Sequence, residues 1–193
     1  MMRLLVISAV ECFDGETELI NGLFEAGMEI LHLRKPGINL PVYLDLLEGI
    51  DQRFQDRLVL HQFHDQGLLR GIRRFHFSEK QRMETDRSFK MDMTWSTSVH
   101  RLPLADDTGV FDYVFFGPVF DSISKPGYLG TVDAQFRLPE TGRQKLIAIG
   151  GISPDNIRLV AEMGFGSAAV LGALWKEPVK AIETFNRLKY LCS

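Results

Sequence analysis

The sequence lacks several features that would mark a secreted or membrane-bound protein. It has two cysteines, Cys12 and Cys192, which lie at opposite ends of the chain without metal-ligand spacing. We expect both to be free thiols in a reducing cytoplasm. No apolar run is long enough to span a bilayer. The apolar run at the start of the sequence ends at Glu11, which makes it too short for a signal peptide. We therefore expect a cytoplasmic protein with no membrane partner.

The chain also lacks an excess of positive charge. Its formal net charge is −3 at pH 7, which leaves no basic footprint for nucleic acid. The hydrophobic share of 45% and the charged share of 24% are ordinary for a globular protein. Because no stretch resembles a linker, we expect one domain over residues 1–193. Whether the chain forms a homo-oligomer is left open.

What the chain does contain is a series of short apolar runs at roughly even spacing. Eight such runs have the length of strands, at residues 4–7, 29–33, 58–60, 74–77, 93–97, 113–116, 146–149 and 168–171. Most intervals show helical periodicity, but the segment 79–90 is polar and shows no helical stripe. Apolar strands that alternate with amphipathic helices predict a parallel sheet covered by helices. Eight units favour a small α/β (β/α)8 TIM barrel, with an open doubly wound sheet as the alternative.

In such a barrel, ligand chemistry lies on the loops that follow the strands. Arg34 and Lys35 follow the second strand, and His61 follows the third. An imidazole at the barrel mouth can act as a general base near neutral pH, so His61 is a catalytic candidate. Glu79, in the FHFSEK turn, is a second candidate that could accept a proton. His100 is expected to be peripheral.

The stretch FDYVFFGPVFDSISKPGYLG, residues 111–130, predicts a phosphate site. Its loop supplies hydroxyls, an ammonium group and backbone N–H groups at the end of a strand, from Ser122, Ser124 and Lys125. Gly150 and Gly151 follow the seventh strand, which with the eighth forms the usual phosphate position of a barrel. The alternative is a polar surface loop beside tightly packed glycines. Together these features favour a phosphorylated ligand.

The order of the segments HLRK, FHFSEK, WSTSVH, DYVFFGPVFDSISK, IAIGGISPDN and AAVLGAL resembles the thiamine phosphate synthase/TenI superfamily over nearly the whole chain. The resemblance implies a barrel that binds a thiazole phosphate, a pyrimidine pyrophosphate or both. It assigns Arg34 to the family arginine after strand 2. It also implies that Ser122, Ser124 and Lys125 bind the phosphate or pyrophosphate of the ligand. The residues that match the family's thiazole-phosphate cradle, meaning its binding site for that group, are Gly150, Gly151, Leu171 and Gly172.

The chain departs from the synthase pattern where the resemblance places two Mg²⁺-binding aspartates. Gln62 and Gln81 stand there, and a neutral amide is a poor ligand for a hard divalent ion. No metal site is predicted, and Mg²⁺ would be a cofactor only if synthase activity is retained. The TenI branch of thiazole tautomerases needs no metal, but Pro118 occupies the place of its catalytic histidine. Isomerisation would need another base, with His61 as first choice and Glu79 in reserve.

These observations predict a thiamine-biosynthesis enzyme whose partner is a small phosphorylated thiazole or thiamine phosphate. The reaction would be either coupling of pyrimidine pyrophosphate to thiazole phosphate or proton-transfer isomerisation of the thiazole. The alternative from another class is a non-catalytic binder that has kept the phosphate cradle. A different phosphosugar isomerase on the same barrel is a third reading, since fold alone does not set function.

Overall fold

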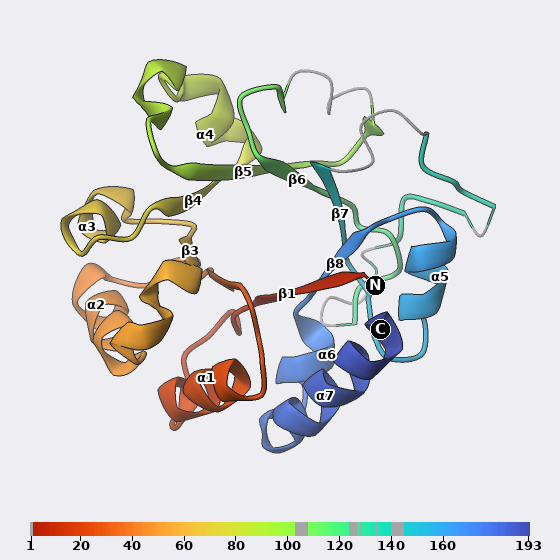
Figure 1. The fold of residues 1–193 in the computed structure, drawn as a ribbon, viewed down its shortest axis with the longest axis horizontal. Helices are drawn as coiled ribbons and strands as arrows, with labels where there is room; N and C mark the ends of the chain where they lie inside the picture. Colours follow the sequence, from red (N-terminus) through yellow and green to blue (C-terminus); the bar gives the residue numbers. More distant parts are fainter. Residues whose placement is uncertain (1, 103–107, 124–126, 128, 134, 140–144) are drawn as a thin grey trace.

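The computed structural model describes residues 2–102, 108–123, 127, 129–133, 135–139 and 145–193. Its strands form one closed parallel barrel in which β8 pairs with β1 (Figure 1). The strands are β1 Arg3–Ile7, β2 Leu31–Leu33, β3 Leu58–Leu60, β4 Arg74–Phe77, β5 Thr94–Val99, β6 Tyr113–Phe116, β7 Leu146–Ile149 and β8 Ser167–Val170. The predicted (β/α)8 barrel is confirmed, and the open-sheet alternative is wrong because the first and last strands pair directly.

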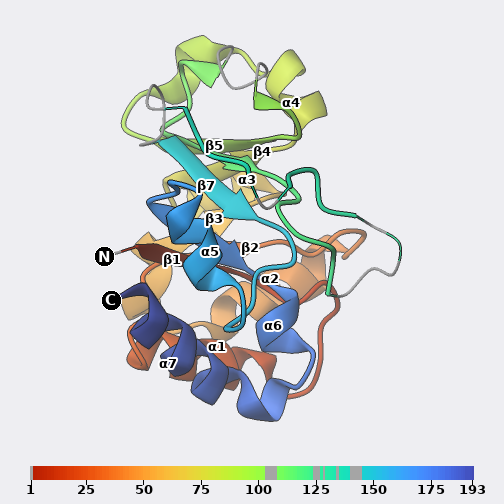
Figure 2. The same ribbon diagram turned by 90° about the vertical axis from the view of Figure 1, so that its right-hand side faces the viewer.

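Helices surround the barrel on its outer face (Figure 1). They are α1 Glu16–Glu25, α2 Leu40–Gly49, α3 His64–Leu69, α4 Glu79–Glu84, α5 Ile157–Glu162, α6 Gly172–Trp175 and α7 Ala181–Cys192. Short 3-10 helices occupy Gln52–Arg57, Arg87–Lys90 and Pro178–Lys180. Helices α1 and α7 contact each other, and Figure 2 shows them together on one side of the barrel. No helix in the described part of the chain is long and apolar enough to cross a membrane.

The segment 79–90 differs from the expectation, because a short helix forms in it. The Ser78 hydroxyl accepts a hydrogen bond from the Gln81 N–H, and the Gln81 side chain accepts one from the Ser78 N–H. This reciprocal capping box satisfies two backbone donors that a helix start leaves unpaired. Helix α4 is therefore specified by its cap rather than by an apolar stripe, and a search for periodicity alone misses it.

Side chains along each strand alternate between the barrel interior and the helix layer. The apolar part of the interior consists of Leu5, Ile7, Ile30, Val59, Phe115, Ile147 and Ala169. A larger apolar core lies between the strands and the helices. On β2 and β4, however, the inward positions carry His32 and His76, whose rings both contact Phe115. The interior is thus apolar on one side and polar on the other.

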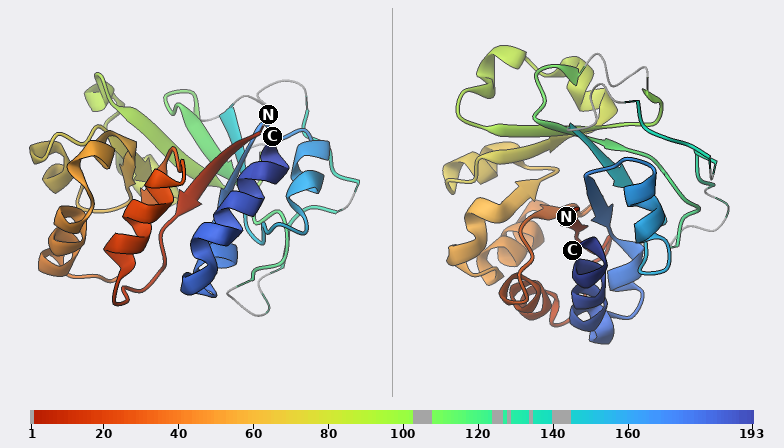
Figure 3. Two further views of the ribbon diagram at one scale, coloured as in Figure 1. Left: turned by 60° about the horizontal axis from the view of Figure 1, so that its bottom comes forward. Right: turned by 45° about the vertical axis from the view of Figure 1, so that its right-hand side comes forward.

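The two ends of the described chain lie side by side at the N-terminal end of the barrel (Figure 3). The Met2 N–H donates to the carbonyl oxygen of Cys192 at 2.8 Å. Helix α7 contacts both β1 and α1. The last helix therefore covers the junction at which the barrel closes.

A buried ion pair connects the loop after β2 to the start of α1. The Lys35 ammonium lies 2.6 and 2.7 Å from the two carboxylate oxygens of Glu16, and it donates to the Glu11 carbonyl at 3.0 Å. The side chains of Lys35 and Glu16 are only 1% and 2% exposed. The Lys35 ammonium is thus fully engaged inside the protein.

We predict that Lys35→Met will destabilise the fold, because it leaves the Glu16 carboxylate buried without its partner. Breaking a buried ion pair from one side costs about 3–5 kcal/mol, which denaturant unfolding would measure. The double variant Glu16→Leu/Lys35→Met should recover most of this loss, since no charge stays buried.

The control for this variant is Lys180→Met, which removes a lysine whose ion pair with Glu177 lies at the surface. Its denaturation midpoint should match that of the parent. A Lys35→Met protein as stable as the parent would show that the buried pair contributes nothing.

Candidate functional site

A cavity of about 220 Å³ lies among the C-terminal ends of β5, β6, β7 and β8. Its polar lining comes from Ser98 and His100 at the end of β5 and from Ser122 in the loop after β6. The apolar lining includes Phe115 and Ile149. This is the end of a barrel at which ligands bind, because the loops there carry the variable side chains.

Two glycines after β7 form one wall of this cavity. Gly150 and Gly151 have φ angles of 99° and 65°, in the left-handed region that favours glycine. A Cβ atom on Gly151 would lie 2.2 Å from the carbonyl oxygen of Asp121, and one on Gly150 would lie 2.6 Å from the Cα of Pro118. Glycine at both positions therefore lets the loop after β7 approach the loop after β6 closely enough for both to line one cavity.

The structure brings five of the predicted phosphate-binding residues to this cavity: Ser122, Gly150, Gly151, Leu171 and Gly172. They come from the loops after β6, β7 and β8, which are separated by long stretches of sequence. Ser124 and Lys125, from the same predicted group, lie outside the described residues.

The other predicted site residues do not line the cavity. The Lys35 side chain points to Glu16, as described above. Glu79 is the first residue of α4; its carboxylate is half exposed and lies 3.9 Å from the Arg82 guanidinium. Arg34 is partly buried, which lowers its pKa; burial is also the main cause that lowers the pKa of His61, and the charge of Arg34 makes a smaller contribution. Arg34 directly follows β2 and His61 directly follows β3, and these two strands pair in the polar half of the barrel.

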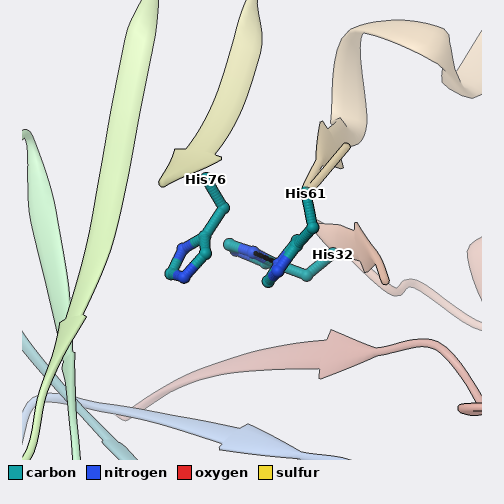
Figure 4. Close-up of side chains that lie close together, drawn as sticks. All are labelled: His32, His61 and His76. Atoms are coloured by element: carbon teal, nitrogen blue, oxygen red, sulfur yellow. Dashed lines mark hydrogen bonds between the residues drawn. The ribbon is translucent and has the colours of Figure 1, made fainter. Parts of the chain in front are cut away.

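Three histidines converge in that polar half, as Figure 4 shows. His32 lies on β2, His61 directly follows β3, and His76 lies on β4. The His32 Nδ1 and the His61 Nε2 are 3.0 Å apart, so the N–H of one ring donates a hydrogen bond to the nitrogen of the other. The rings of His61 and His76 stack with centroids 4.1 Å apart. No spacing in the sequence marks this cluster, because its members come from β2, from β4 and from the residue after β3.

Hydroxyl groups bind the outer sides of these rings. The Tyr113 hydroxyl lies 2.8 Å from the His32 Nε2. His76 is held from both sides, with its Nδ1 2.9 Å from the Ser96 hydroxyl and its Nε2 3.0 Å from the Ser98 hydroxyl. Since Ser98 also lines the cavity, the histidine cluster and the cavity are adjacent.

Burial keeps the cluster neutral. Loss of hydration is the main cause that lowers the pKa of His32 and His61, and repulsion from His76 lowers both further. For His76, burial and then the charges of His64 and Arg34 lower the pKa to about 3. All of these imidazoles are therefore uncharged at neutral pH.

The position of His100 differs from the expectation that it is peripheral. It directly follows β5 and lines the cavity beside Gly117 and Pro118. Its Nδ1 lies 2.8 Å from the carbonyl oxygen of Gly117, to which the N–H form donates. The only sequence signal was its position immediately after a predicted strand, which it shares with many residues that do not reach a cavity.

Comparison with known proteins assigns this barrel to a family. A family model described as thiamine monophosphate synthase matches residues 4–174. The chain belongs to the thiamine monophosphate synthase/TenI family. Thiamine-phosphate synthases of Bordetella avium and Koribacter versatilis are 42% and 33% identical to it over 74 and 102 residues. These matches cover 35% and 50% of this chain but only 34% and 48% of those relatives.

Solved structures of thiamine phosphate pyrophosphorylases share this fold along the full chain. The protein from Bacteroides thetaiotaomicron superposes with a TM-score of 0.77 and 26% identity, covering 98% of this chain and 97% of that one. The protein from Pyrococcus furiosus gives a TM-score of 0.75 at 17% identity, covering 99% and 95%, which supports the fold alone.

This family member does not fit the Mg²⁺ site that the synthase resemblance implies. The Gln62 side chain accepts from the Lys35 N–H at 3.3 Å and donates to the Lys35 carbonyl. Gln81 is engaged in the capping box of α4. Both amides are bound to backbone groups, and neither supplies the negative charge that Mg²⁺ favours.

We predict that acid will destabilise this thiamine monophosphate synthase family member through its histidines. His76 has a pKa of about 3 in the fold against 6.5 ordinarily, so between these values the unfolded chain binds more protons. The contribution of His76 to the free energy of unfolding should therefore have its full value above pH 6.5, and it should decrease as the pH drops towards 3. His76 alone should contribute up to about 1.4 kcal/mol per pH unit.

Denaturant unfolding across this pH window, in buffer with a chelator, tests the prediction. His76→Gln should flatten the dependence, because glutamine keeps hydrogen-bonding groups and does not titrate. A variant whose stability falls with acid as steeply as that of the parent would contradict the assignment to His76.

Proposed function

We propose that this protein binds a phosphorylated thiazole in the cavity at the ends of β5 to β8 and acts on it in thiamine biosynthesis. The observation that carries the proposal is the convergence of the predicted phosphate-binding residues from three separate loops on one cavity. A hydroxyl from Ser122 and a close backbone approach at Gly150 and Gly151 suit a phosphate group.

The rest of the cavity suits a small heteroaromatic ring. Phe115, Ile149, Ile152 and Ala169 provide apolar walls. The volume of about 220 Å³ is below the ~300–1,000 Å³ of pockets that hold drug-sized ligands. One thiazole phosphate is therefore favoured over a thiazole and a pyrimidine pyrophosphate bound together.

Proton-transfer isomerisation of the thiazole is the reaction that these residues support best. Coupling releases pyrophosphate, and Gln62 and Gln81 stand where the resemblance places the two carboxylates that would hold a metal against that charge. Isomerisation needs only a positioned acid–base group. We take His100 as the proton carrier, ahead of His61 and Glu79, because His100 lines the cavity.

A non-catalytic binder of thiamine phosphate is the second candidate. Pro118 lines the cavity where the resemblance places the tautomerase histidine, and proline cannot carry a proton.

Incubation with a thiazole phosphate carboxylate, and separately with both synthase substrates and Mg²⁺, distinguishes the possibilities. An isomerised thiazole supports the proposal, and thiamine phosphate formed only with Mg²⁺ assigns synthase activity. Binding without either product supports the binder, and no binding refutes the cavity assignment.

We predict that Lys125→Ala will weaken binding of thiazole phosphate, because it removes a cation from the loop that contains Ser122. The loss should be about 1.5–3 kcal/mol, as for a hydrogen bond to a charged group, and calorimetric titration would measure it. Lys180→Ala removes an exposed lysine that pairs with Glu177 and should bind like the parent. Equal affinities for the parent and the Lys125 variant would rule out a role for this lysine.

We predict that His100→Asn will cut isomerase turnover by about a hundredfold or more, the usual share of a positioned acid–base group. Affinity for thiazole phosphate should change little, because the proposed phosphate-binding residues lie on the loops after β6, β7 and β8. His61→Asn is the matched comparison, since it removes an imidazole that does not line the cavity. A greater loss in the His61 variant would assign the proton transfer to His61 instead.

A further inference from the structure

The histidine cluster has a geometry that the proposed reaction does not use. His32, His61 and His76 each offer one ring nitrogen, and these nitrogens all lie within 4.8 Å of one another. They come from β2, from the residue after β3 and from β4, so three neighbouring strands bring the rings close together inside the barrel (Figure 4). We propose that His32, His61 and His76 bind a divalent transition-metal ion of the Zn²⁺ type inside the barrel.

The ligand set selects the class of ion. Imidazole nitrogen suits Zn²⁺, Co²⁺, Ni²⁺ and Cu²⁺, whereas Mg²⁺ requires oxygen ligands. With Zn–N bonds of about 2.0–2.1 Å, nitrogens around a tetrahedral ion lie about 3.4 Å apart. The His32 Nδ1 and the His61 Nε2 are 3.0 Å apart. A small increase in this distance would therefore match the spacing of two ligands on one ion.

One ring must turn to complete the site. An imidazole binds a metal through a lone pair in the ring plane, and the planes of His61 and His76 are nearly parallel, at 20°. His61 is the ring that can turn, because it directly follows a strand and is less enclosed than His32 and His76. Its bond to the His32 Nδ1 would then give way to two bonds to the ion.

The surrounding hydroxyls are placed to support the ligands from outside. Histidines that bind metals usually donate their other ring N–H to a neighbouring acceptor, which sets the ring orientation. The Tyr113 hydroxyl at the His32 Nε2 leaves the His32 Nδ1 for the ion. His76 has a serine hydroxyl at each ring nitrogen. When one nitrogen binds the ion, the hydrogen bond between the other nitrogen and its serine can therefore remain. Burial also keeps the imidazoles neutral, so protons do not compete with the metal near pH 7.

Three protein ligands leave a fourth position on a tetrahedral ion, as in sites that keep a bound water or ligand. Because the imidazoles carry no charge, an anionic group at this position would offset part of the charge of the ion. Ser98 bonds to His76 and also lines the thiazole cavity, so the ion would lie next to that cavity. The metal site does not depend on the proposed function, because it uses residues outside the cavity lining.

The test is titration of the chelator-treated full chain with Zn²⁺ by calorimetry and with Co²⁺ by absorption spectroscopy. We expect one ion per chain, the visible absorption bands of tetrahedral Co²⁺, and no competition from Mg²⁺. His61→Asn should weaken Zn²⁺ binding by more than about a hundredfold, beyond the ~10–100-fold cost of losing an outer partner. Tyr113→Phe should weaken it by about tenfold, since it removes only such a partner.

His100→Asn is the matched control, because it makes the same substitution at a histidine outside the cluster and should bind Zn²⁺ like the parent. Circular dichroism would confirm that each variant is folded, and Zn²⁺ should raise the thermal midpoint of the parent but not of the His61 variant. Absence of stoichiometric Zn²⁺ binding by the parent would overturn the proposal. So would an octahedral Co²⁺ spectrum, or a folded His61→Asn protein with the affinity of the parent.

Discussion

Closure of the sheet between β1 and β8 is the constraint on which the rest of the structure depends. Four residue pairs, from Arg3 with Ser167 to Val6 with Val170, join the first and last strands. A closed barrel has no free sheet edge, and it confines every inward side chain to a narrow interior. Because all the strands are parallel, their C-terminal ends meet at one rim. The loops after β6, β7 and β8 then border one cavity although they are distant in the sequence.

The interior of the barrel is divided into an apolar part and a polar part. The polar part holds a network of two hydrogen-bonded groups, one running from His61 through His32 to Tyr113 and the other from Ser96 through His76 to Ser98. Polar groups in such an interior must be paired, since an unpaired one loses its hydration without compensation. The network satisfies this requirement, and it ends at the wall of the ligand cavity.

Much of the fold was predictable because it rests on local patterns. The apolar runs match the strands within two residues, even where 93–97 proved to be Thr94–Val99. The glycines after β7 predicted that the backbone there approaches another group closely. The structure shows why glycine is needed: both glycines have positive φ angles, and the Asp121 carbonyl leaves no room for a side chain at Gly151. The parts that were missed depend on individual side chains. Lys35 directly follows β2, where ligand-binding residues of a barrel lie. Its ammonium nevertheless pairs with Glu16, because this carboxylate from α1 is buried beside it.

The sequence by itself determined the barrel and the approximate positions of its strands, since these follow from the spacing of apolar runs and from the glycines and prolines that interrupt them. Only the tertiary structure decided which side chains meet. His32 and Tyr113 are 81 residues apart and share a hydrogen bond, and His100 reaches the cavity that Glu79 does not. The physical reason is that such contacts depend on the register of neighbouring strands and on barrel closure. These are set by the packing of all eight strands together and not by any one segment.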